Sequence, residues 1–139
     1  MTDSVRSAPI FHLSFPVRDL DEGLSYYTAT LGGIPGRRAQ DWADVALFGA
    51  QLTLQHAPGD VLEPMPRSRH FGVTLGWREW ETLVGRLEDF AEPPRVDHQG
   101  TDREQAKAMV RDPSGNLIEL KAYRQPEAVF AWLAGGRQP

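Results

Sequence analysis

The fold is decided by a stretch that occurs twice in the chain, first as Pro9-Ile10-Phe11-His12-Leu13-Ser14-Phe15-Pro16-Val17 and again as Arg69-His70-Phe71-Gly72-Val73-Thr74-Leu75-Gly76-Trp77. Each copy is rich in β-branched and aromatic residues, so each predicts a strand with a histidine near its start. A helix and further strands are expected after each copy. The second half closes with Asp112-Pro113-Ser114-Gly115-Asn116-Leu117-Ile118-Glu119-Leu120, which brings a carboxylate into an otherwise apolar strand. Two histidines and one carboxylate from a repeated design favour a metal site.

The first copy predicts a βαβββ unit. Strand 9–17 is followed by a helix that begins at the N-cap pair Asp19 and Glu22 and ends at Gly32-Gly33. Pro16 is expected to end the first strand or to place it at a sheet edge. Short strands are expected between residues 35 and 57, the last of them at 50–56. Alternation in this last strand places Leu52 and Leu54 on one face and its polar residues on the other, namely Gln51, Thr53 and Gln55.

The same order starts again after a proline-rich linker. One face of a second helix is predicted from helical spacing, with strands at 94–99, 106–111 and 116–123 after it; this face consists of Trp80, Leu83, Val84, Leu87 and Phe90. A helix at 126–134 is expected to pack Val129, Phe130 and Trp132 onto the chain or onto a second subunit. We therefore expect an α+β fold in which two paired βαβββ modules form a cupped mixed sheet. Residues 1–139 form a single domain on this prediction, with module one at about 9–57, a linker at about 58–68, module two at about 69–124 and a tail at 125–139.

Composition excludes several classes of function. With 139 residues, 40% hydrophobic residues and a formal net charge of -4, the chain predicts a globular domain with no electrostatic footprint for nucleic acid or an anionic membrane. No apolar run approaches the length of a membrane span and no signal peptide is evident, so the expected location is the cytoplasm. The chain has no cysteine, so a metal would have to be held by His, Asp, Glu, Gln or water.

The predicted metal ligands are His12, His70 and Glu119. Strand side chains point to one face, so these residues meet only if different strands present them on a shared face. Such a donor set suits Fe(II), Mn(II), Ni(II) or Zn(II) and leaves coordination positions open for a substrate. Taken alone, a histidine in an apolar strand is more commonly a hydrogen-bonded core residue, and it is the pairing of two histidines that favours ligation. Alternation leaves open whether Glu119 faces a buried site or solvent, because Leu117 shares its side and Ile118 and Leu120 share the other.

A fourth ligand is sought in strand 50–56. We take Gln55 as the candidate there, because an amide oxygen can bind a metal, a metal-bound water or the substrate. The alternatives on its face are Gln51 and Thr53, and Gln55 can equally be a polar residue that lines a pocket. His56 faces the other way and His98 lies next to a turn, so both are predicted to be surface residues.

The chain resembles the vicinal oxygen chelate superfamily, which includes glyoxalase I, fosfomycin-resistance proteins, extradiol dioxygenases and bleomycin-resistance proteins. The resemblance extends over nearly the whole chain and rests on the two His-Phe segments, Leu47-Phe48-Gly49 and above all Asp-Pro-x-Gly-Asn-x-x-Glu at 112–119. It implies that His12, His70 and Glu119 fall on the metal-ligand positions of the first, fifth and eighth strands. It also implies a homodimer and a small-molecule substrate bound through two adjacent oxygens, with Glu119 as a ligand that can also act as the base. The reaction class stays open between lyase, isomerase, transferase and dioxygenase.

Departures from the superfamily pattern narrow these expectations. Glyoxalase I-like members carry a glutamate in the fourth strand, where this chain has only Gln51, Thr53 or Gln55. Extradiol dioxygenases carry a tyrosine where this chain has Met109. The alternative function is a metal-free ligand-binding or sequestration protein of the bleomycin-resistance type, and the presence of all three ligand residues weighs against it.

Overall fold

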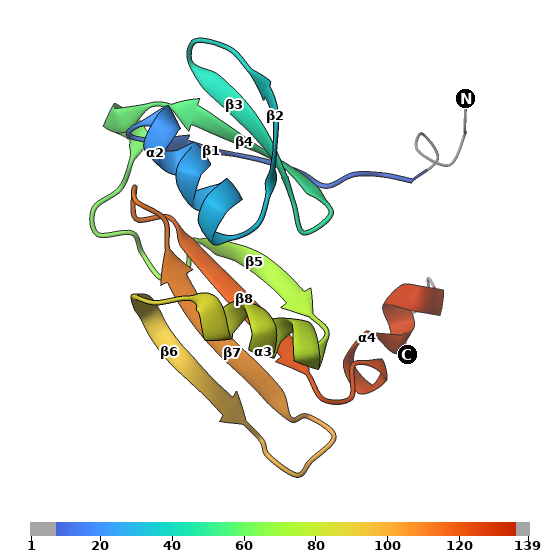
Figure 1. Cartoon of the computed structure of the whole chain (residues 1–139). Coiled ribbons are helices and arrows are strands. Elements are labelled where there is room, and N and C mark those ends of the chain that lie inside the picture. Colours follow the sequence, from blue (N-terminus) through green and yellow to red (C-terminus); the bar gives the residue numbers. More distant parts are fainter. Residues whose placement is uncertain (1–7, 136–139) are drawn as a thin grey trace. The chain divides into compact units, whose positions relative to one another are not determined.

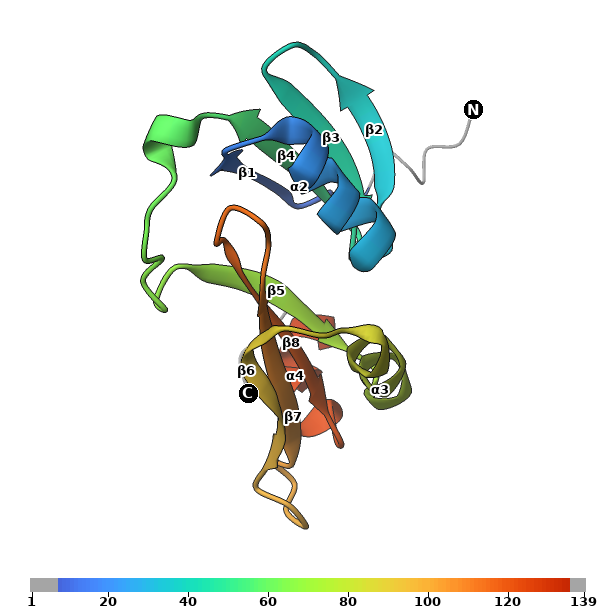
Figure 2. The same ribbon diagram turned by 60° about the vertical axis from the view of Figure 1, so that its left-hand side comes forward.

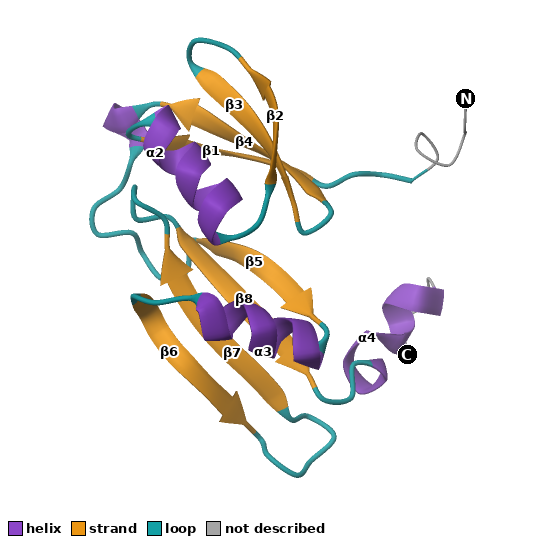
Figure 3. Cartoon of the chain, viewed as in Figure 1, coloured by secondary structure: helices purple, strands orange, loops and turns teal. Residues whose placement is uncertain are grey.

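The computed structural model describes residues 8–135, which divide into two compact units. The first unit comprises residues 8–64 together with the loop 112–115, and the second comprises residues 65–111 and 116–135. Each unit contains one four-stranded mixed sheet with few helices (Figure 1 and Figure 3). The predicted α+β class and the repeated βαβββ order are therefore confirmed.

The first sheet has the strand order β1-β4-β3-β2. Its strands are β1 (His12–Val17), β2 (Ile34–Arg38), β3 (Trp42–Leu47) and β4 (Ala50–His56). β1 runs parallel to β4, and the other neighbours are antiparallel. Pro16 lies inside β1, which an edge strand permits because one side of its backbone has no strand partner.

The helix after β1 forms as its capping residues predict. α2 (Leu20–Ser25) begins after Asp19, whose side chain accepts a hydrogen bond from the Glu22 backbone nitrogen. It continues as the single π-turn η1 (Tyr26–Thr30), and Gly32 then adopts a φ of 86°, which ends the helix. The helix lies against β3 and β4, where Val17, Tyr27, Val45 and Leu54 are fully buried.

The second sheet repeats this order as β5-β8-β7-β6. It consists of β5 (His70–Leu75), β6 (Phe90–Asp97), β7 (Gln105–Arg111) and β8 (Leu117–Tyr123). In the chain, the short 3-10 turn η2 (Pro58–Asp60) comes between β4 and β5, and α3 (Trp77–Arg86) comes between β5 and β6. β5 runs parallel to β8, as β1 does to β4. α3 lies along one face of this sheet in both views (Figure 1 and Figure 2). Trp80 fixes that packing, because its indole nitrogen donates to the Leu120 carbonyl at 2.8 Å.

Two details of the prediction were wrong. Phe90 does not belong to the apolar face of α3, because the helix ends at Arg86 and Phe90 is the first residue of β6. β6 therefore starts earlier than predicted and ends at Asp97. The apolar pattern of the helix extends in the sequence to Phe90 because Leu87, which directly follows α3, is also buried.

The C-terminal helix α4 (Glu127–Gly135) forms in the predicted region. Phe130 packs edge-on against Tyr123 with ring centroids 5.3 Å apart. Trp132 remains 39% exposed, and packing of its side chain onto a second subunit stays a prediction. None of the helices within residues 8–135 is long and apolar enough to cross a membrane.

Candidate metal centre

His70 is the first residue of β5, and its ring is held by the backbone that precedes the strand. Its Nδ1 lies 2.7 Å from the Arg67 carbonyl oxygen. A carbonyl oxygen only accepts hydrogen bonds, so Nδ1 carries a proton, and in the neutral form of the ring the lone pair lies on Nε2. A backbone or carboxylate partner on the second ring nitrogen is typical of metal-binding histidines, because it fixes the tautomer and the ring orientation.

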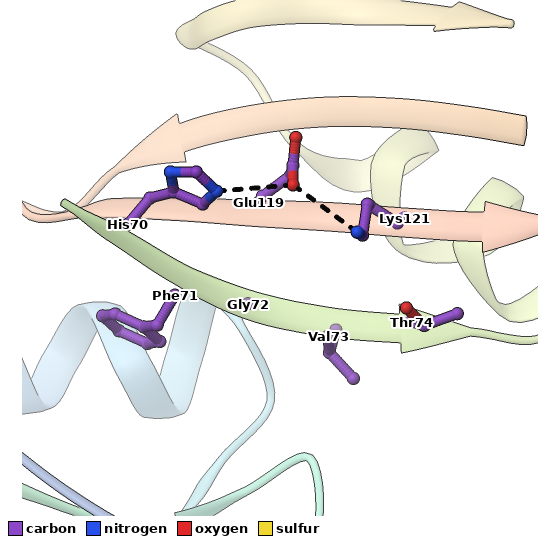
Figure 4. Close-up of a pocket in the computed structure, with 7 residues that line it drawn as sticks. All are labelled: His70, Phe71, Gly72, Val73, Thr74, Glu119 and Lys121. Carbon is purple, nitrogen blue, oxygen red and sulfur yellow. Dashed lines mark ion pairs between the residues drawn. The ribbon is translucent and has the colours of Figure 1, made fainter. Parts of the chain in front are cut away.

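Glu119 lies in the middle of β8 with its carboxylate turned toward His70 (Figure 4). Its Oε1 is 3.6 Å from His70 Nε2, and its side chain is 13% exposed. The two faces of β8 are now distinguished, since Ile118 and Leu120 are fully buried on the side covered by α3. Glu119 lies on the opposite side, called here the site face, together with His70, Lys107 and Lys121.

The separation of the imidazole and the carboxylate is chemically informative. At 3.6 Å the two atoms are too far apart for a strong hydrogen bond. Bonds of about 2.0–2.2 Å from a metal to nitrogen and to oxygen allow one ion to bind both atoms at such a separation. His70 and Glu119 are therefore a compatible pair of ligands for a borderline divalent ion.

Gly72 makes the approach of β5 to Glu119 possible. The two residues are partners in the parallel register of β5 and β8. A Cβ atom at position 72 would overlap the carbonyl oxygen of Glu119, so any side chain would push the strands apart. A glycine inside a strand can indicate a close approach of another backbone. The sequence alone does not show which residue approaches Gly72, because that depends on the register with β8.

A pocket of about 300 Å³ lies along β5 and β8 beside this pair. Its lining is mostly polar at the surface and consists of His70, Phe71, Gly72, Val73, Thr74, Glu119 and Lys121. Figure 4 shows His70, Glu119 and Lys121 on one side of β5 and Phe71 and Val73 on the other. Such a volume suits a small ligand.

Lys121 is a site residue that the sequence reasoning missed. Its Nζ lies 3.9 Å from Glu119 Oε1, two residues along the same strand and on the same face. The sequence indicated only that Lys121 lies two residues after Glu119 and so shares its face of the strand. This places Lys121 at the site once the face of Glu119 is known.

His12 holds a similar place in the first unit, although the carbonyl at its ring comes from the neighbouring strand β4. It is the first residue of β1, and its Nδ1 lies 3.2 Å from the Gln51 carbonyl oxygen, which leaves Nε2 as the available nitrogen. The structure thus brings His70 and Glu119 together in the second unit and places His12 in the first. Among residues 8–135, no group of three or more His, Asp or Glu side chains forms a ready metal cluster.

The strand register shows which residue of the first unit occupies the counterpart of Glu119. Two residues after His12, Ser14 pairs with Thr53, just as Gly72 pairs with Glu119 two residues after His70. Gln55 lies one step further along the same face. Its amide nitrogen donates to the Ser14 hydroxyl at 3.0 Å.

Thr53 belongs to a hydrogen-bonded group around the buried carboxylate of Asp44. Thr53 Oγ1 donates to Asp44 Oδ1 and Arg37 Nε donates to Asp44 Oδ2, both at 2.7 Å. Gln51 Nε2 approaches the same carboxylate at 3.5 Å. Burial acts to raise the pKa of Asp44, but the hydrogen bonds from Thr53 and Arg37 outweigh burial and lower the pKa below its ordinary value.

The two remaining histidines lie where the sequence places them. His56 is exposed at the end of β4, and His98 is exposed in the turn after β6 with a φ of 55°. Both serve as natural controls for His12 and His70.

The family model for the Glyoxalase/Bleomycin resistance protein/Dioxygenase superfamily matches residues 10–120. The chain belongs to this superfamily. No curated protein matches it.

Solved structures of superfamily type share the fold. A glyoxalase/bleomycin resistance protein/dioxygenase from Alicyclobacillus acidocaldarius is 29% identical, with 87% of this chain and 96% of that chain covered and a TM-score of 0.78. The fosfomycin resistance protein FosX from Listeria monocytogenes is 15% identical, with coverage of 88% and 98% and a TM-score of 0.68, so this likeness shows the fold alone.

The Asp112–Gly115 segment, which carries much of the superfamily resemblance, has a structural role in the first unit. Asp112 is buried and accepts a hydrogen bond from the Tyr27 hydroxyl at 2.8 Å. Burial, with a contribution from Asp112, raises the pKa of Tyr27 well above its ordinary value and that of Tyr26 to about 12. The Ser114 hydroxyl accepts from the Arg18 backbone nitrogen at 2.9 Å, just before α2 begins. The motif therefore orders the loop that leads directly into the strand of Glu119.

Proposed function

We propose that this protein is a metal-dependent enzyme of the superfamily that acts on a small, oxygen-rich substrate. His12, His70 and Glu119 are the proposed ligands of one divalent ion, which is Fe, Mn, Ni or Zn. The observation that carries the proposal is the position of Glu119 Oε1, 3.6 Å from an imidazole nitrogen whose lone pair is left free by the hydrogen bond on the other side of the ring.

The donor set fits such an ion. Two neutral imidazoles and one carboxylate are typical ligands of these metals, and three protein ligands leave positions open. His12 and His70 hold equivalent places at the starts of β1 and β5, and in each a backbone carbonyl engages Nδ1. Equivalent positions with equivalent tautomers support a shared role.

Each residue has a distinct task on this proposal. A bound ion would stabilise negative charge that develops on two adjacent oxygens of the substrate. The Arg67 and Gln51 carbonyls keep the two rings oriented. Glu119 supplies a ligand and can move a proton at the substrate. Gln55 is proposed to orient substrate or water through its amide oxygen, since its amide nitrogen is bonded to Ser14. The small-molecule substrate, the homodimer and the cytoplasmic location stay predictions.

Metal content tests the proposal directly. The protein is purified without chelator, reconstituted with Fe, Mn, Ni or Zn in turn, and measured by elemental analysis. We expect about one ion per chain in the wild type and little in His12→Ala, His70→Ala or Glu119→Ala. The matched controls are His56→Ala and His98→Ala, which remove exposed histidines and should keep the ion. Absence of metal from the reconstituted wild type would contradict the proposal.

One observation favours the metal-free alternative. Lys121 Nζ lies 3.9 Å from Glu119 Oε1 and already offers the carboxylate a positive partner. In a sequestration protein, Glu119 would serve this ion pair, and ligand affinity would be the same with and without a chelator. The metal content of the reconstituted wild type separates the two functions, because only the enzyme is expected to hold an ion.

A further inference from the structure

The two lysines of this chain lie side by side on the site face. Of its 15 basic residues only two are lysines, at positions 107 and 121. The antiparallel register of β7 and β8 makes Lys107 and Lys121 direct partners, so both side chains leave the sheet on the same face. Like charges in such a pair repel each other, which makes this an unfavourable arrangement for a sheet surface unless an anion lies between or beside them.

The neighbouring acids only partly offset these two charges. Lys121 Nζ is 3.9 Å from Glu119 Oε1 and 5.9 Å from the centre of the Tyr123 ring. Lys107 Nζ is 3.8 Å from Asp97 Oδ2, and that carboxylate also pairs with Arg95 at 3.3 Å. These lysine distances exceed hydrogen-bond length, and among residues 8–135 neither ammonium group donates a hydrogen bond.

The local charge on this face is positive in a chain whose net charge is negative. The acids Glu92 and Asp97 are engaged by arginines: Arg67 pairs with Glu92, and Arg95 contacts both. Lys107 therefore shares Asp97 with Arg95, and Glu119 is the acid beside Lys121. The formal net charge of the whole chain is -4. When Glu119 acts as a metal ligand, its charge no longer offsets Lys121.

Lys121 is also positioned to meet a ligand. It lines the pocket of about 300 Å³ next to His70 and Glu119, and its side chain is 32% exposed. Thr74, its partner in the register with β5, lines the same pocket and adds a hydroxyl donor. Figure 4 shows Lys121 on the same side of β5 as Glu119.

We infer that Lys121, assisted by Lys107, forms a subsite for the oxyanion group of a small ligand, beside the metal ligands His70 and Glu119. The shared chemistry is a carboxylate, phosphate or phosphonate group that receives charge-assisted hydrogen bonds from an ammonium group. The inference rests on the proposed function in taking this ligand to be the substrate, and it then specifies the substrate as an anion.

NMR of the lysine side chains tests the subsite on the full chain. Reductive methylation with a ¹³C label keeps the lysine charge and gives one signal for each lysine besides that of the amino terminus. Lys107→Met and Lys121→Met assign the signals. The metal-free protein is titrated with inorganic phosphate and, separately, with glycolate, and ethylene glycol is the neutral control. We expect a saturable shift of the Lys121 signal and a smaller shift of the Lys107 signal, both weaker at high salt. Tighter binding of phosphate would indicate a phosphate-type group on the ligand, and tighter binding of glycolate would indicate a carboxylate.

Three variants separate this inference from the proposed function. Lys121→Met should weaken anion binding about tenfold or more and keep the metal. Glu119→Gln should lose the metal and bind the anion at least as tightly, because a competing carboxylate is gone. Arg78→Met makes the same charge change on α3, where Arg78 is exposed, and should bind like the wild type.

Two results would overturn the subsite. One is a Lys121 signal that does not respond to either anion. The other is anion binding to the metal-free protein that is as tight in Lys121→Met as in the wild type, which would place the anion away from Lys121. A Lys121 signal that responds in a protein unable to bind metal would support the subsite and refute the proposed function.

Discussion

The two sheets share one topology but place different chemistry at equivalent positions. Each opens with a histidine, His12 or His70, whose Nδ1 is engaged by a backbone carbonyl. In the strand beside it, the first sheet has Thr53 where the second has Glu119. The Thr53 hydroxyl donates a hydrogen bond to the carboxylate of the buried Asp44 at 2.7 Å, whereas Glu119 Oε1 lies 3.6 Å from His70 Nε2.

This difference indicates how a repeated fold divides its tasks. In the first sheet, the carboxylate of Asp44 receives hydrogen bonds from Thr53 and Arg37 and is satisfied within the unit. In the second sheet, the carboxylate of Glu119 borders a pocket and its distances leave it available to a ligand. The first carboxylate is expected to stabilise the fold, and the second is expected to serve the site.

The largest expected effect on stability is at the register partners of Glu119 and Thr53, which are Gly72 and Ser14. Gly72→Ala should destabilise the protein by about 3 kcal/mol, because the new methyl group overlaps the Glu119 backbone. Ser14→Ala, the counterpart in the first sheet, should change the free energy of unfolding by less than about 0.5 kcal/mol. Urea unfolding followed by circular dichroism measures both. Equal effects of the two substitutions would show that the close approach at Gly72 is not required.

The two carboxylates should respond oppositely to neutralisation. Asp44→Asn should cost about 1–3 kcal/mol, because an amide cannot accept every hydrogen bond now made to the buried carboxylate. Glu119→Gln should stay within about 0.5 kcal/mol of the wild type or be more stable, as is common for residues kept for function. Urea unfolding followed by circular dichroism measures the free energy of unfolding of both variants. Strong destabilisation by Glu119→Gln would assign Glu119 a structural role.

A smaller effect is expected in the acid dependence of stability. The pKa of Asp44 is lowered in the folded protein by hydrogen bonds from Thr53 and Arg37, which outweigh the effect of burial. Its contribution is therefore complete above the unfolded pKa of about 3.9 and is lost as the pH falls through the lower folded pKa. Stability measured between about pH 5 and pH 2 should fall more steeply in the wild type than in Asp44→Asn. Parallel curves would contradict this assignment.

The smallest effect is expected at Gln55. Its position is one step beyond the counterpart of Glu119, and its amide nitrogen is bonded to Ser14. Gln55→Ala should keep the metal content of the wild type, with Glu119→Ala as the comparison. Loss of metal would make Gln55 a fourth ligand, and unchanged substrate binding or turnover would remove Gln55 from the site altogether.

Local signals in the sequence were sufficient for much of the fold. Asp19 and Gly32 marked the ends of a helix because capping and positive φ are properties of a few neighbouring residues. The starts of β1 and β5 at His12 and His70 follow from strand composition in the same way. Phe90 was misassigned because helical spacing alone does not show where a helix ends.

The site depended on information that is not local. Alternation could not decide which face of β8 carries Glu119, because that depends on which side α3 covers. The roles of Gly72 and Lys121 required the register of β5, β7 and β8. Asp44 was missed for the same reason, since its partner Thr53 lies on the neighbouring strand.

The most direct test of the central claim is a Zn²⁺ titration of the protein labelled with ¹⁵N, observed at its four histidine side chains. We predict that the Nε2 signals of His12 and His70 change until about one equivalent is added, while their Nδ1 atoms keep their protons. His56 and His98 should not respond. If Zn²⁺ leaves His70 unchanged, or shifts the exposed histidines instead, the second sheet does not hold the proposed metal centre.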